Sequence, residues 1–200
     1  IAHDFQLFPY QATAVNRGYE EGVLDDQEKL TTFTSACGPV VYLGEQFPEG
    51  FRGNAFVCGP EANLIKRYLI ENNGLAYTAE PAYQEEEFLV SKDETFRPVN
   101  LYTGLNGALY LVDLRKGIIQ HRAYMTSYLR EKILEKGLEK INGLGRMYKI
   151  THEENDFAVV HFTNYTTDDF LTLLKSGNGA LRIAAQKELV FSKDKTLKEA

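Results

Sequence analysis

The stretch Gly38–Gly59, GPVVYLGEQFPEGFRGNAFVCG, decides the fold class of the chain. It contains two runs of β-branched and aromatic residues, VVYL and AFV, which are joined by a loop that closes on Gly53 and Asn54. This pattern predicts a β-hairpin, because a tight turn needs a positive φ angle that Gly and Asn tolerate. A similar pattern recurs in Phe96–Gly117, FRPVNLYTGLNGALYLVDLRKG, with its turn at residues 104–107. Repeated hairpins of this kind are typical of β-propeller blades.

Further short strands are predicted around the two hairpins, from apolar and β-branched runs that lie between turn residues. They are expected at residues 31–35, 63–69, 75–79, 88–91 and 145–151. One helix is expected to interrupt the strands, because Thr126 and Ser127 can cap its start and Gly137 can end it. The predicted fold class is therefore mainly β: a partial β-propeller of about two antiparallel blades with an inserted helix.

The C-terminal part has a helical pattern. It follows a polar stretch, Thr151–Asp156, that is typical of a linker. Thr166–Asp169 can cap a first short helix, and Ala180–Phe191 has the apolar spacing of a second one. Such a helical hairpin resembles one unit of a helical repeat, which cannot bury its apolar face alone. We therefore predict two domains, residues 1–152 with the blades and residues 153–200 with the helical hairpin.

The composition excludes some classes of protein. With 200 residues, of which 44% are hydrophobic and 25% charged, the chain can bury a core. The net charge of -6 and the absence of a Lys/Arg-rich run give no support for a nucleic-acid partner. No apolar run approaches the roughly 20 residues of a membrane span.

Because the chain begins at Ile1, we expect it to be a piece of a longer, processed protein.

The two cysteines, Cys37 and Cys58, flank the first hairpin. If its strands pair across the loop, the two positions come nearly opposite each other, and a cross-strand disulfide can form. A disulfide would suit a periplasmic or secreted protein. The alternative is a pair of buried free thiols, and two cysteines alone do not predict a metal site.

The hairpin segments resemble a known family. GPVVYLGEQFPEGFRGNAFVCG, together with FRPV followed by GLNGALY, is similar to the β-propeller of soluble sugar dehydrogenases that use pyrroloquinoline quinone (PQQ), the glucose/sorbosone dehydrogenase superfamily. AVNRGYEEGVLD, SACGPVVY, GIIQHRAYMTSYLREKILEKGL and GLGRMYKI resemble a membrane-bound dehydrogenase subgroup of large bacterial proteins. In that subgroup the propeller is followed by HEAT-like helical repeats and often by a c-type cytochrome domain. The similarity covers about Ala14 to Ile150.

This resemblance implies that the chain holds the last blades of a propeller and the first HEAT-like repeat. It implies a parent protein in the periplasm or cell envelope that oxidises a sugar or alcohol with PQQ and calcium and passes electrons to the cytochrome. The chain has no Cys-x-x-Cys-His sequence, so it carries no covalent haem site of its own. The catalytic residues of the family would lie upstream of Ile1, and no cofactor is expected to be bound by this chain alone.

The cofactor-binding candidates are Arg97, Arg52 and Arg115, because the family pairs basic side chains of inner loops with the cofactor's carboxylates. Arg97 falls on an arginine position of the family pattern. Two family positions differ, since Thr95 stands where the family has an arginine and Glu61 where it has a lysine.

Each candidate also has a structural interpretation. Arg97 can pair with an acid such as Asp113, Arg52 can bond loop carbonyls in its turn, and Asp113 and Arg115 can form a pair at a strand end. His121 can be a ligand or proton shuttle, but without a neighbouring His or Cys a packed or surface role is favoured.

Three functions therefore stay open at this stage. The first is part of a dehydrogenase-like quinoprotein, the second a non-catalytic module that binds a glycan or a protein, and the third a connector between propeller and helices. Thr95 and Glu61 favour the second or third for this chain. Unpaired strand edges of an incomplete propeller also predict a homodimer.

Overall fold

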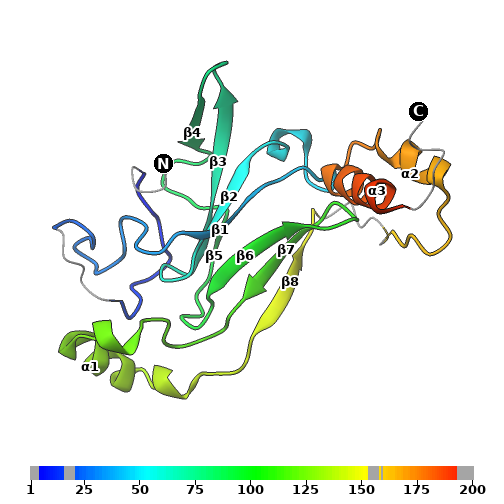
Figure 1. Ribbon diagram of the computed structural model, residues 1–200. Coiled ribbons are helices and arrows are strands. Elements are labelled where there is room, and N and C mark those ends of the chain that lie inside the picture. The colour runs from blue at the N-terminus through cyan, green and yellow to red at the C-terminus, as the bar shows by residue number, and fades with distance from the viewer. Residues whose placement is uncertain (1–4, 16–20, 153–157, 159, 193–200) are drawn as a thin grey trace. The chain divides into compact units, whose positions relative to one another are not determined.

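The computed structural model describes residues 5–15, 21–152, 158 and 160–192 (Figure 1). Within these residues the chain has eight β-strands and three α-helices, and the strands form two antiparallel sheets. The prediction of a mainly β chain with a helical C-terminal part is therefore confirmed. None of the described helices combines the length and the apolar composition needed to cross a membrane.

The first sheet contains β1 (Cys37–Val41), β2 (Ala55–Gly59), β3 (Leu64–Asn72), β4 (Tyr77–Pro81) and β5 (Leu89–Val90). It is built around β3, which pairs with β2 along one side and shares its other side between β4 and β5. β4 pairs with residues 68–72 and β5 with residues 64–65. Residues 66 and 67 therefore have no strand partner on that side, and the chain between β4 and β5 leaves the sheet there.

The predicted first hairpin is confirmed as β1 and β2, with Gly53 at φ +79° in the connecting loop. The second sheet contains β6 (Pro98–Thr103), β7 (Leu109–Asp113) and β8 (Arg146–Ile150) in that order. The predicted second hairpin is β6 and β7, and its turn is closed by a bond from Gly104 N–H to the carbonyl of Ala108.

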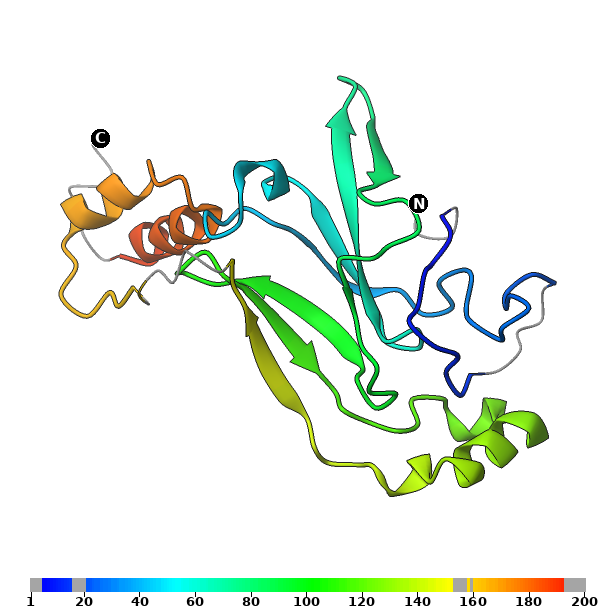
Figure 2. The same ribbon diagram turned by 180° about the vertical axis from the view of Figure 1, so that it is seen from behind.

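The predicted inserted helix is α1 (Ser127–Glu135), which lies in the chain between β7 and β8 (Figure 2). The hydroxyl of Thr126 accepts a bond from the Leu129 N–H, and Gly137 adopts φ +63° just after the helix. Both ends of the helix therefore lie where the sequence predicted them. A hydroxyl satisfies a free N–H at the start of a helix, and glycine readily takes a left-handed conformation at its end.

The two C-terminal helices are α2 (Thr167–Leu173) and α3 (Gly179–Phe191). Thr166 and Asp169 form a capping box, in which each side chain bonds the backbone N–H of the other residue. Asn178 caps α3 through its side-chain oxygen and the Ala180 N–H. The predicted helical hairpin is thus present in the described residues. Of the predicted linker Thr151–Asp156, residues 153–156 lie outside them.

Contacts divide the chain into two compact units. The first comprises Ile1–Val41, Asn54–Leu101 and Leu111–Tyr148. The second comprises Tyr42–Gly53, Tyr102–Tyr110 and Lys149–Ala200. The second unit therefore joins loop segments of both hairpins with the C-terminal helices, and the proposed division at residue 152 stays a prediction.

The core of the first unit lies on one face of the first sheet. Leu64 and Tyr68 of β3 belong to a buried apolar cluster with Leu7, Leu30 and Phe33 from the N-terminal segment. Because side chains alternate along a strand, Lys66 shares this face with Leu64 and Tyr68. The sequence of β3 thus inserts a cation into an otherwise apolar face.

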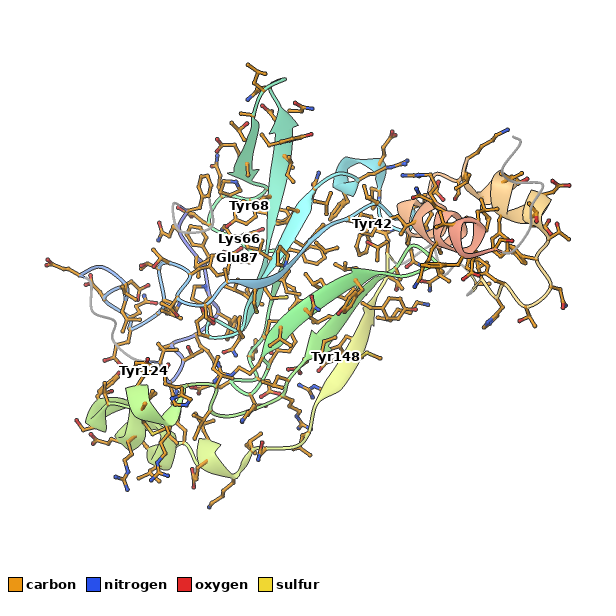
Figure 3. All side chains as sticks on the ribbon, viewed as in Figure 1. Tyr42, Lys66, Tyr68, Glu87, Tyr124 and Tyr148 are labelled. Carbon is orange, nitrogen blue, oxygen red and sulfur yellow. The ribbon has the colours of Figure 1, made fainter. Side chains whose placement is uncertain are left out.

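The second unit is organised around the buried Tyr42 hydroxyl, which is labelled in Figure 3. It donates to the carbonyl of Gly107 at 2.6 Å and accepts from the N–H groups of Gln46 and Phe47 at 3.0 and 3.1 Å. The helical hairpin is attached to the same loops, because Gly179 N–H donates to the Leu43 carbonyl at 2.7 Å.

One predicted strand is wrong. Residues 31–35 form bends and irregular structure, and the nearby pairing is an isolated bridge between Leu24 and Leu30. The reason is Glu61, whose carboxylate accepts bonds from the N–H groups of Thr34 and Ser35. These N–H groups are therefore not available to a strand ladder. The edge strands are β1, β4 and β5 in the first sheet and β6 and β8 in the second. The homodimer through such edges stays a prediction.

Candidate functional site

Arg97 is a buried structural residue in the first unit, with only 1% of its surface exposed. Its guanidinium donates three bonds to backbone carbonyls: Nε to Lys116 at 3.0 Å, Nη1 to Pro60 at 2.8 Å and Nη2 to Gly117 at 3.0 Å. Burial lowers the pKa of Arg97, although four surrounding carboxylates act in the opposite direction. The side chain thus ties the second hairpin to the loop before β3.

Asp113, the acid expected to pair with Arg97, organises the same region by a different set of bonds. One carboxylate oxygen accepts the backbone N–H groups of Arg97 at 2.7 Å and Arg115 at 2.8 Å. The other accepts Nε of Arg146 at 2.7 Å. The ion pair at this strand end is therefore Asp113–Arg146, and the residue that sequence reasoning missed is Arg146, which lies on β8.

The other two arginines lie in different environments. Arg52 belongs to the second unit, and its Nη2 donates to the carbonyl of Gly177 at 2.6 Å. Arg115 is half-buried in the first unit, and its backbone N–H bonds Asp113. Arg52 therefore bonds a carbonyl, as its structural interpretation expected, although that carbonyl belongs to the segment before α3 rather than to its own loop.

The two positions that differ from the family pattern also bond locally. The hydroxyl of Thr95 donates to Asp93 at 2.6 Å. The buried Glu61 carboxylate accepts the Ser35 hydroxyl at 2.7 Å in addition to two backbone N–H groups. His121 accepts a bond from the Ala123 N–H through Nδ1 and so caps a 3₁₀ turn. These side chains stabilise loops.

Cys37 and Cys58 are register partners across β1 and β2, as the sequence predicted. Both are free thiols in the structure, Cys37 half-buried and Cys58 fully buried. Burial raises the pKa of both thiols, so neither has the thiolate character of a reactive cysteine. The disulfide itself stays a prediction.

We expect an oxidant to join the two thiols and to stabilise the first unit by about 3 kcal/mol, because the bridge closes a loop of moderate length. Thiol labelling in denaturant should find no free thiol after oxidation, and urea unfolding should shift to lower concentration when a reductant is added. A Cys37→Ser variant is the control, since it should not respond to the reductant. Two labelled thiols after oxidation would contradict the prediction.

A pocket of about 330 Å³ opens in the first unit beside the part of β3 that lacks a strand partner. Phe5 and Phe8 of the N-terminal segment and Tyr83 from the β4–β5 connection contribute aromatic rings to its wall. Lys66, Glu80 and Glu85 add charged groups. The pocket exists because the chain leaves the sheet between β4 and β5 and the N-terminal segment crosses at the same place.

Lys66, which lines this pocket, forms a buried ion pair with Glu87, which does not line it. The distance from Nζ to Oε1 is 2.9 Å, and each side chain is 1% exposed. Lys66 also donates to the carbonyl of Gln6 at 2.9 Å, and the N–H of Phe8 donates to Glu87 at 3.1 Å. Burial raises the pKa of Glu87, and its bonds from Lys66 and Phe8 offset this only in part. The pair therefore fixes the N-terminal segment to the sheet.

Two buried oxygens beside this ion pair have no hydrogen-bond partner among the described residues: Oε2 of Glu87 and the hydroxyl of Tyr68. Nζ of Lys66 is 6.0 Å from the centre of the Tyr68 ring and 5.6 Å from that of Phe8. Figure 3 shows Lys66, Tyr68 and Glu87 close to one another beside β3. Buried polar atoms without a partner are uncommon, and they often occur where a ligand or water binds.

Sequence reasoning missed this pocket. In the acidic run Glu85–Glu87, Glu85 and Glu86 are exposed, whereas the side chain of Glu87 is buried in its pair with Lys66. The signal that could have found the pair is Lys66 itself, a charge on the inward face of the strand LIKRYL. The described residues contain no group of three or more His, Cys, Asp or Glu that could hold a metal ion.

Comparison with known proteins identifies a matching family model. It is described as a domain of unknown function, DUF7133, and it matches residues 3–154. None of the curated proteins and none of the solved structures compared with the chain matches it significantly. The matched residues include both sheets, α1 and the residues that line the pocket.

Proposed function

This chain belongs to the DUF7133 family of domains of unknown function, and we propose that it is a binding module that holds a small sugar or sugar alcohol in the Lys66 pocket. The single observation that carries the proposal is a pocket whose walls combine aromatic rings with carboxylate and amide side chains. The pocket volume of about 330 Å³ lies in the range of small-molecule sites.

The chemistry of the pocket suits a polyhydroxylated ligand. A sugar presents apolar C–H groups, which pack on rings such as Phe5, Phe8 and Tyr83, and hydroxyls that donate to carboxylates and amides. Glu80, Gln84 and Glu85 supply such acceptors around the rings. The Lys66–Glu87 pair holds the N-terminal part of the wall in place, so the site is largely formed before a ligand binds.

Oxidation of a sugar by a quinone is a proposal for a parent protein rather than for this chain. Carboxylates of PQQ would need arginines with available guanidinium groups. All three nitrogens of the Arg97 guanidinium donate to backbone carbonyls, and its side chain is buried. Arg97 therefore does not fit the cofactor. A cytochrome partner and a place in the periplasm or cell envelope stay predictions from the resemblance.

The finer fold is also part of the proposal: the two sheets are two blades of a propeller. In support, both sheets have their main strands in sequential antiparallel order, β1-β2-β3-β4 and β6-β7-β8, which is the connectivity of a blade. The helical hairpin would then be the first of a series of HEAT-like repeats. A solved structure of a longer chain in which these sheets are not arranged around a common axis would refute this part.

The binding proposal is tested by titrating the chain with glucose and sorbitol, followed by NMR shifts and calorimetry. We expect binding at about millimolar affinity or better. Phe8→Ala should weaken binding by about tenfold, because it removes one ring of the pocket. Tyr10→Ala is the matched control, since Tyr10 is an exposed aromatic residue of the same segment that does not line the pocket. Absence of binding, or equal weakening by the two variants, would refute the proposal.

A further inference from the structure

The Lys66 pocket has an excess of negative charge. Its lining contains one cation, Lys66, and two carboxylates, Glu80 and Glu85. Lys66 is already neutralised by Glu87 at 2.9 Å. Glu80 and Glu85 are exposed at the mouth and form no ion pair with another described residue. A ligand therefore meets two carboxylates that no cation of the described chain neutralises.

The hydrogen-bonding groups of the pocket point to the same kind of ligand. The ammonium of Lys66 is already engaged by Glu87 and the Gln6 carbonyl, so it has little left to donate. The carboxylates of Glu80 and Glu85 are acceptors only, whereas the side-chain amides of Gln6 and Gln84 can both donate and accept. The site therefore has more acceptors than donors, and a complementary ligand is rich in N–H and O–H groups.

The aromatic wall is compatible with a positive charge. The ring of Phe8 already lies 5.6 Å from the Lys66 ammonium, and Phe5 and Tyr83 add two further rings to the wall. Ring faces attract cations, and the attraction grows as the cation loses water. Arg67 is bonded to the Tyr83 hydroxyl at 3.0 Å and does not line the pocket.

From these three observations we infer that the ligand carries a protonated amine, and that the pocket prefers an amino sugar over a neutral sugar of the same size. The inference rests on the proposed sugar-binding function and names its ligand class. The amine lies between the Glu80 and Glu85 carboxylates, while the sugar ring packs on the aromatic wall.

The test compares glucosamine, glucose and N-acetylglucosamine on the whole chain by calorimetry at low salt. Glucosamine should bind about three- to tenfold more tightly than glucose, as expected for two exposed carboxylates. N-acetylglucosamine should lose this advantage because its nitrogen is uncharged. The Glu80→Gln/Glu85→Gln double variant should bind glucosamine and glucose with equal affinity. Glu71→Gln is the control, since Glu71 is an exposed carboxylate of β3 outside the pocket.

The possible outcomes separate the two claims. If glucose and glucosamine bind equally, or if the double variant keeps the preference, the inference fails and the sugar-binding function stands. If no sugar of the three binds, both fail. Loss of the preference in the Glu71→Gln control would show a general charge effect and would also overturn the inference.

Discussion

Replacing Arg97 with alanine is expected to lower the free energy of unfolding by about 3–5 kcal/mol, because a buried cation that donates three hydrogen bonds is removed. Three backbone carbonyls, those of Pro60, Lys116 and Gly117, would lose their donor. The space left by the largest fully buried side chain of the described chain would add a cavity cost. Urea unfolding followed by circular dichroism measures the change.

Arg115→Ala is the matched control. Arg115 is also a strand-end arginine and a sequence-predicted cofactor residue, but it bonds Asp113 through its backbone N–H, which alanine keeps. We expect a loss below about 1 kcal/mol. If Arg97→Ala does not fold, Arg97→Lys, which keeps the charge but not the fork of donors, should fold with an intermediate loss. An Arg97→Ala or Arg97→Lys variant as stable as the wild type would refute the structural role.

A Gly38→Ala substitution is expected to cost at least about 3 kcal/mol, from two independent causes. Gly38 adopts φ +53°, a left-handed conformation that is unfavourable for alanine. Its added Cβ would also lie 2.5 Å from the Asn100 Cα and from the Val99 carbonyl oxygen, which belong to the backbone of β6 and cannot rotate away. Gly38 lies at the register shift between Cys37 and Val40, where β1 bulges.

The control separates these causes. Gly74 in the β3–β4 turn has φ +84°, but no described atom lies within 4 Å of the place that an added Cβ would occupy. Gly74→Ala should therefore show only the backbone cost of about 1–2 kcal/mol. Thermal unfolding of both variants gives the difference. Equal losses for the two variants would mean that β1 does not pack closely against β6 at this point.

The local elements could be predicted from the sequence because their causes are local. Asn and Gly in the turns, Thr126 at the start of α1 and the Thr166–Asp169 capping box each act within about four residues. The opposite positions of Cys37 and Cys58 followed from the hairpin register in the same way. The strand predicted at residues 31–35 failed because a distant carboxylate, that of Glu61, binds its N–H groups.

The partners of charged side chains depended on the tertiary structure. The sequence showed arginines at strand ends, but only the fold determines that Arg97 bonds three carbonyls while Asp113 pairs with Arg146 from a strand 33 residues away. The candidate pocket also depends on the tertiary structure, since Phe8, Lys66 and Tyr83 of its lining come from three separate segments.

The stretch Gly38–Gly59 alone determined a hairpin, and together with the similar stretch Phe96–Gly117 it determined a mainly β chain. Both followed from the sequence because turn geometry and side-chain alternation are properties of neighbouring residues. Where the chain buries a charge was decided only by the tertiary structure. A buried cation is stable only beside the groups that replace its water, and for Lys66 these are Glu87 and the Gln6 carbonyl, which lie far from it in the sequence.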